Sequence, residues 1–236
     1  HGDGGGSPIT HATRVAGTLI AKGVDSDAKG MAFAGSVNAY NWTNDLGEMA
    51  DAAGDINNPL QISVHPYQTT AGWIRGRFND QSEPDTEEPL GWYWFGDKAQ
   101  EESFYFGYYD ETARSWDNVA YQAPYYLIVA SAGNHRGVEP PDGTSDEEIF
   151  LFDDSEWKKL SDLSGVNRPI KDGGNEGYDS LAGFNLSKNV LSVGAVDGTG
   201  NNFFVNSSWG PTDDGRIKPD VVAKGVGVTS PTALND

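Results

Sequence analysis

The sequence predicts an α/β fold with three layers: a mainly parallel central sheet and helices on both of its faces. Along the 236 residues, strand-length apolar runs alternate with amphipathic helical segments, the pattern of a parallel sheet covered by helices. The apolar fraction of 37%, with 11% aromatic residues, is enough for one sizeable core. We therefore expect a single domain over 1–236, with insertions at about 73–110 and 138–178.

Helices are expected over 11–22, 45–53 and 111–122. Thr10 is a candidate N-cap for the first helix, and Pro124 closes the third. Strands are expected over 60–64, 125–130, 189–196 and 218–223. The run 125–130 is nearly all apolar, which is typical of a strand buried on both faces.

Two insertions interrupt this alternation and are predicted to be surface elaborations. The first contains an acidic loop over 82–89, and the second opens with a Pro- and Gly-rich turn. The first also holds an aromatic cluster, interpreted as a small packed core, with a carbohydrate- or peptide-binding platform as the alternative: Trp92, Tyr93, Trp94, Phe95, Phe104, Tyr105, Phe106, Tyr108 and Tyr109. The acidic stretches 83–88 and 142–154 favour a solvated surface, because neither has regular ligand spacing; a structural calcium site is the alternative.

Charge and composition exclude several classes of protein. The net charge of −19 argues against a nucleic-acid partner, since a polyanion would meet like charge over most of the surface. The absence of cysteine excludes a disulfide framework, a thiol nucleophile and a thiolate zinc site. No apolar run approaches the length of a membrane-spanning helix, so no membrane span is expected.

Two polar positions are candidates for chemistry. His11 lies in the first turn of the first expected helix, where the helix dipole favours the neutral imidazole that a general base needs. Asn134 ends the segment 131–134 directly after the most apolar strand, at the edge where open α/β sheets bind ligands. Its side-chain amide is a neutral donor suited to a developing oxyanion.

Three segments together resemble the subtilisin-like serine peptidases. HATRVAGT at 11–18 is similar to the family's histidine motif, and SAGN at 131–134 to its oxyanion-hole segment. SSWGPTDDGRIKPDVVA at 207–223 resembles the segment shortly before the family's nucleophile motif, and it is the most specific of the three. The resemblance implies a serine endopeptidase that cleaves polypeptides through an acyl-enzyme, with no cofactor required for the chemistry. It also raises the expectation of structural calcium.

Carried over onto this sequence, the resemblance makes His11 the general base and Asn134 the oxyanion donor. It implies that the wall of the primary specificity pocket is formed by Ser131, Ala132 and Gly133. It further implies that a polypeptide substrate pairs as an added strand with the extended segment that contains Ser63, Val64 and His65. The acidic surface and the lack of cysteine suit a secreted or cell-surface enzyme.

The family's catalytic Asp and Ser are not found in this chain. Asp3 lies in a Gly-rich stretch rather than on an upstream strand, and Ser230 lacks the preceding Gly-Thr of the nucleophile motif. The domain is therefore expected to be incomplete at both ends, and the chain alone to be inactive. The missing Asp and Ser would come from the rest of a longer parent chain or, in a split enzyme, from another chain. A pseudopeptidase, or a peptide- or carbohydrate-binding module without turnover, is the alternative.

Overall fold

The expected parallel strands form one four-stranded sheet in the computed structural model, which describes residues 10–40, 42–82, 84–100, 102–169 and 177–232. The sheet order is β1-β4-β7-β8, and each neighbouring pair is parallel. Its strands are β1 (Ile62–His65), β4 (Leu127–Ser131), β7 (Leu191–Val196) and β8 (Val221–Lys224). Each strand begins two or three residues later than the sequence predicts. Three of them, β1, β4 and β8, end one residue later.

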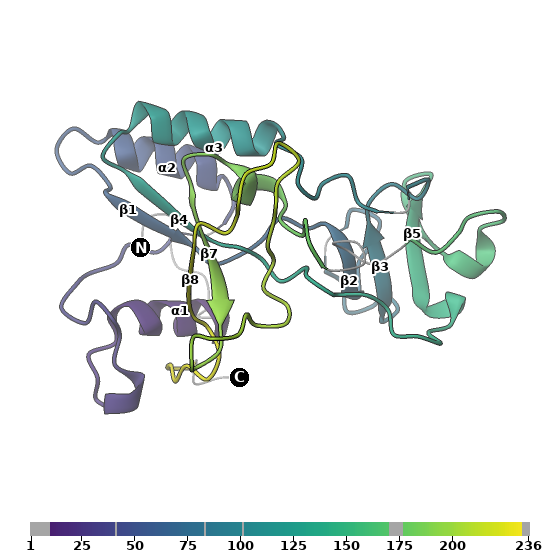
Figure 1. Cartoon of the computed structure of the whole chain (residues 1–236), viewed down its shortest axis with the longest axis horizontal. Helices are drawn as coiled ribbons and strands as arrows, with labels where there is room; N and C mark the ends of the chain where they lie inside the picture. Colours follow the sequence, from purple (N-terminus) through teal and green to yellow (C-terminus); the bar gives the residue numbers. More distant parts are fainter. Residues whose placement is uncertain (1–9, 41, 83, 101, 170–176, 233–236) are drawn as a thin grey trace.

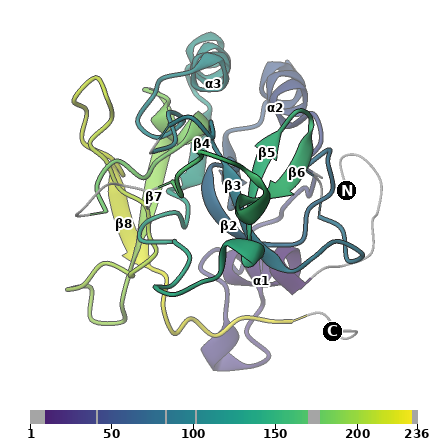
Figure 2. The ribbon, with the colours of Figure 1, turned by 90° about the vertical axis from the view of Figure 1, so that its right-hand side faces the viewer.

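Helices cover the sheet from both sides. The helices are α1 (Thr10–Ile20), α2 (Asp45–Gly54) and α3 (Glu111–Gln122), with short 3-10 turns at η1 (Ser26–Ala28), η2 (Asp146–Glu148), η3 (Leu160–Asp162) and η5 (Gly183–Leu186). In Figures 1 and 2, α2 and α3 lie on one side of the sheet and α1 lies on the other. The three-layer α/β fold predicted from the sequence is confirmed. Thr10 was predicted to be an N-cap, but it is the first residue of α1, and its hydroxyl has no hydrogen-bond partner among the described residues.

The main core lies between the sheet and the pair α2 and α3. Trp116 of α3 stacks on Phe184 of η5 at a ring separation of 4.3 Å. Ile128 and Ala130 of β4 are buried against the same cluster. The Asp110 side chain accepts the Ala113 backbone N–H at 2.8 Å, which caps α3 and fixes where it begins.

The β4 strand is buried on one face only, so the expectation of burial on both faces was wrong. Ile128 and Ala130 point toward α3, whereas Leu127 is 42% exposed. Neighbouring aliphatic side chains on that second face, Ile62 and Val64 of β1, are also exposed. The reason is that α2 and α3 pack on one face, and the described residues cover the opposite face only in part.

The two insertions pair with each other in a second four-stranded sheet, of order β2-β3-β5-β6. Its strands are β2 (Gly72–Gly76), β3 (Gly91–Phe95), β5 (Ile149–Asp153) and β6 (Glu156–Lys159). The junction is the parallel pairing of β3 with β5, in which Tyr93 lies opposite Phe150. Figure 1 shows this second sheet beside the first, at the right of the molecule. Trp73 and Trp94 are buried in its own core. We call this part the insertion lobe.

Candidate active site

The carboxyl ends of β1 and β4 lie side by side. The two strands are parallel and in register, with His65 opposite Ala130. The chain continues from β1 into 66–70 and from β4 into 131–134, so these two segments leave the sheet at the same edge. Polar groups at the carboxyl edge of a parallel sheet are exposed to ligands. This edge is therefore the candidate active site.

His11 lies at this edge, as the second residue of α1. Its ring is exposed, and Nε2 lies 3.0 Å from the carbonyl oxygen of Pro66. A carbonyl oxygen only accepts, so Nε2 carries the proton in this arrangement and the neutral ring holds its lone pair on Nδ1. A proton-accepting role for Nε2 requires that the ring release Pro66.

Asn134 lies at the same edge. Its backbone N–H donates to the Gln68 side-chain oxygen at 2.6 Å, while its own side chain is exposed. Pro66 and Gln68, which bind His11 and Asn134 respectively, are two residues apart, so their Cα atoms are separated by no more than about 7 Å. The structure therefore brings His11 and Asn134 to one edge of the sheet rather than to opposite sides of the molecule.

The segment that ends in Asn134 is held by several hydrogen bonds. The Ser131 hydroxyl donates to the Tyr67 carbonyl at 3.0 Å, and the buried Ala132 donates its N–H to the Val193 carbonyl at 2.9 Å. Gly133 has φ +96°, a conformation that other residues rarely adopt, and its carbonyl accepts the Ser208 N–H at 3.0 Å. These contacts give the segment one geometry before any ligand binds.

His135 continues this network into the interior. Its N–H donates to the Ser208 hydroxyl at 3.0 Å, and its Nε2 donates to the Thr69 carbonyl at 2.9 Å. Burial lowers the pKa of His135 to about 4, so the ring is neutral near pH 7. Gln68, Ser208 and His135 were not predicted as site residues. The sequence signals for them were weak: Ser208 lies within the segment 207–223, and His135 directly follows Asn134.

A second network occupies the inner side of β1. The side chains of Ser63 and His65 point toward α2 and α3, where the His65 ring packs edge-on against Trp116 at 4.7 Å. The Tyr126 hydroxyl donates to the Ser63 hydroxyl at 2.6 Å, and His65 bridges Ser63 and Tyr67, at 2.7 Å to each. The Tyr67 hydroxyl donates to an Asp45 carboxylate oxygen at 2.8 Å.

This chain of donors requires neutral His65. Since Tyr67 donates to Asp45, its oxygen accepts Nδ1–H of His65, and Nε2 in turn accepts the Ser63 hydroxyl. Burial lowers the pKa of His65 to about 4, with the Asp45 carboxylate acting in the opposite direction. The side chains of Ser63 and His65 are thus part of the core. A substrate at β1 would meet backbone and the outward side chain of Val64.

A pair of carboxyl groups lies close together at Gly107. Asp179 and Asp213 converge on Gly107, where a Cβ would overlap oxygens of both. Burial raises the pKa of Asp179 to about 7, with Asp213 and Glu102 adding to the shift by repulsion. Among the described residues, no group of three or more His, Asp or Glu side chains is arranged to hold a metal ion.

Replacing Asp179 with asparagine is expected to remove the stability that this carboxyl group adds as the pH falls from 7 to 4. The folded protein keeps this proton up to about pH 7 and the unfolded chain releases it near pH 3.8, so the stabilisation is complete below pH 3.8 and is lost as the pH rises through 7. At pH 8, Asp179→Asn should therefore raise the urea midpoint relative to the parent chain, and the gain should shrink at pH 5. The matched control is exposed Asp51→Asn. A parallel pH dependence in both variants would contradict the expectation.

In the acidic stretches 83–88 and 142–154, for which structural calcium was the alternative to a solvated surface, two of the carboxylates have local partners. Asp85 accepts the Glu87 N–H at 2.9 Å within its own turn, and Asp153 forms ion pairs with Lys98 and Lys158. Glu83 and Asp3 lie outside the described residues. Structural calcium stays a prediction. The helices in the described part of the chain include none that is long and apolar enough to cross a membrane.

Comparison with known proteins agrees with the fold. The model of the subtilase family matches residues 5–235, nearly the whole chain. No curated protein matches the sequence.

Proposed function

The chain belongs to the subtilase family, whose members are serine peptidases, and on that premise we propose that His11 and Asn134 are its general base and its oxyanion donor. The observation that carries the proposal is the shared edge: both residues bind the three-residue stretch 66–68, one through Pro66 and the other through Gln68. No other histidine of the described residues is exposed at this edge, because His65 and His135 are buried.

In the proposed reaction, His11 removes the proton from a serine hydroxyl as the serine oxygen attacks the scissile carbonyl. The carbonyl oxygen becomes an oxyanion, and the Asn134 side-chain N–H donates to it. His11 then gives its proton to the leaving amine, which leaves an acyl-enzyme. Water, activated by the same imidazole, hydrolyses the ester and restores the serine. The substrate is a polypeptide in an extended conformation along 62–66.

The serine is proposed to come from outside residues 1–236. Pro231 lies against Gly17 of α1, where a Cβ would overlap its ring. Gly17 is six residues beyond His11, or roughly 9 Å along the helix. Ser230, next to Pro231, is therefore placed away from His11. On the basis of the same family resemblance, we also propose that the protein is secreted or located at the cell surface.

The test is to express the complete reading frame that contains this segment and to treat it with a fluorophosphonate probe, with unfolded casein as substrate. We expect labelling of one serine outside 1–236 and hydrolysis of casein, both lost in His11→Ala. The matched control is Arg14→Ala, which changes an exposed residue on the same helix. Residues 1–236 alone should not be labelled. Labelling at Ser230 would show that the nucleophile has been misplaced, and peptide binding without turnover by the complete product would indicate a pseudopeptidase.

A further inference from the structure

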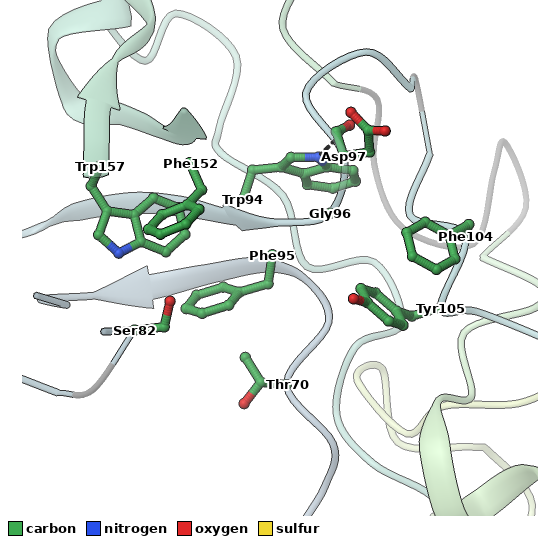
Figure 3. Close-up of a pocket in the computed structure, with 10 residues that line it drawn as sticks. All are labelled: Thr70, Ser82, Trp94, Phe95, Gly96, Asp97, Phe104, Tyr105, Phe152 and Trp157. Carbon is green, nitrogen blue, oxygen red and sulfur yellow. Dashed lines mark hydrogen bonds between the residues drawn. The ribbon is translucent and has the colours of Figure 1, made fainter. Parts of the chain in front are cut away.

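An aromatic pocket opens in the insertion lobe, close to the candidate active site. It has a volume of about 320 Å³. Its lining comes from both insertions and from the segment that follows β1: Thr70, Ser82, Trp94, Phe95, Gly96, Asp97, Phe104, Tyr105, Phe152 and Trp157. Figure 3 shows Phe104 and Tyr105 on one side and Phe95, Phe152 and Trp157 on the other. We call this cavity the lobe pocket.

The lobe pocket lies close to the segment 131–134 that ends in Asn134. Thr70, which lines it, follows Gln68 by two residues, so their Cα atoms are at most about 7 Å apart. Gln68 in turn binds the backbone of Asn134. A polypeptide that extends from the candidate active site along 66–70 therefore reaches the pocket with a side chain only a few residues from the bond to be cleaved.

The walls of the pocket are built before a ligand binds. Trp157 holds both Phe95 and Phe152 edge-to-face, at ring separations of 5.0 and 5.1 Å. On the opposite wall, Phe104 and Tyr105 lie 4.2 Å apart. Phe104 is nevertheless 47% exposed. Exposed aromatic rings grouped around one cavity mark a binding site more often than isolated exposed side chains do.

The charge of the pocket selects the ligand. Asp97 is an exposed carboxylate on the lining, and its Oδ1 is fixed by the Ala99 N–H at 2.8 Å. None of the described lining residues is Lys or Arg. Lys98, the next residue along the chain, forms an ion pair with Asp153. A carboxylate beside several aromatic faces attracts a cation, since the ring faces carry negative potential. The chain's net charge of −19 acts in the same direction.

We propose that the lobe pocket binds an arginine or lysine side chain of the polypeptide substrate, at a position a few residues from the scissile bond. This substrate preference rests on the proposed peptidase function. The aliphatic part of the side chain packs between Phe104 and Phe152, and the cationic end lies over the ring faces beside Asp97. The pocket is thus a specificity site that the two insertions add to the shared site of the family.

The test measures binding of peptides to the full chain by titration calorimetry, which needs no turnover. The peptides are Gly- and Ser-rich decapeptides that differ at one position, which is Arg, Lys, norleucine or Glu. We expect the Arg and Lys peptides to bind about 5- to 30-fold more tightly than the norleucine peptide, and the Glu peptide to bind most weakly. Phe104→Ala and Asp97→Asn should each bring the ratio of affinities, Arg or Lys peptide to norleucine peptide, toward one. The control is Tyr121→Ala, which removes an 83%-exposed aromatic side chain on α3.

The outcomes separate the two proposals. Equal affinity for the Arg and norleucine peptides, or a preference that survives Phe104→Ala, overturns the lobe-pocket assignment and leaves the peptidase proposal standing. Failure of all four peptides to bind overturns the assignment and also counts against a peptide groove. Binding of maltohexaose that is lost in Phe104→Ala, without any preference among the peptides, would show that the lobe binds carbohydrate instead.

Discussion

Replacing Asn134 with alanine in the complete peptidase is expected to lower kcat by about 10²–10³ with little change in KM, the loss measured when this donor is removed from another enzyme of the same family. The physical reason is that the side-chain N–H meets an oxygen that becomes fully charged only in the transition state, so its removal affects turnover more than binding. The backbone N–H of residue 134, which binds Gln68, is kept in the variant.

The retained backbone contact makes the Asn134 variant informative, because the segment stays anchored while one donor is removed. Asn134→Asp, similar in size but without the N–H donor and with an added charge, should be at least as impaired. Exposed Asn58→Ala, on the loop before β1, is the control and should behave like the parent enzyme. Steady-state kinetics on a chromogenic peptide provides the measurement. An unchanged kcat in Asn134→Ala would remove Asn134 from the mechanism.

Lowering the pH from 7 to 4 is expected to destabilise the fold strongly through His65 and His135. Burial depresses the pKa of each from 6.5 to about 4. A base with a depressed pKa contributes stability that is fully present above pH 6.5 and is lost as the pH falls through 4, because the unfolded chain takes up the proton first. A fall of the pKa from 6.5 to about 4 corresponds to roughly 3 kcal/mol of stability for each ring.

Urea unfolding followed by tryptophan fluorescence at half-unit pH steps measures this effect. His65→Gln and His135→Gln should each be less stable than the parent at pH 7 and should show a smaller loss between pH 6.5 and 4. Asp179 works in the opposite direction over this range, so Asp179→Asn should make the acid loss steeper. His11→Ala, which changes an exposed ring, is the control. A parent chain whose stability is flat from pH 7 to 4 would refute the expected protonation of both rings.

Local signals explain how much of the fold could be predicted. The helix 111–122 has the bounds expected from the sequence because Asp110 supplies a cap and the residues Trp116 and Val119 share one apolar side. By contrast, the pairing of β3 with β5 joins strands more than 50 residues apart along the chain. Nothing local identifies the partner of a strand, so the sequence predicts two separate surface elaborations and not one shared sheet.

In the candidate site, too, some residues could be predicted from local sequence and others could not. His11 and Asn134 were predicted because they belong to recognisable segments, but the groups that hold them were not. In β1, alternation favours an inward face made of Ile62 and Val64, with Ser63 and His65 outward. The structure has the reverse, because Tyr126, Tyr67 and Asp45 satisfy the two polar side chains inside the core. A polar network of this kind depends on residues scattered along the chain and leaves no periodic pattern.

The parallel contact between β3 and β5 also bears on how such a protein can change during evolution. Each insertion supplies only half of the second sheet, and a lone pair of strands without its partner would expose Trp73 or Ile149 to water. Deleting one insertion therefore does not produce a smaller, stable form of the protein. It leaves an orphaned hairpin prone to aggregation, so the two segments must be gained and lost together.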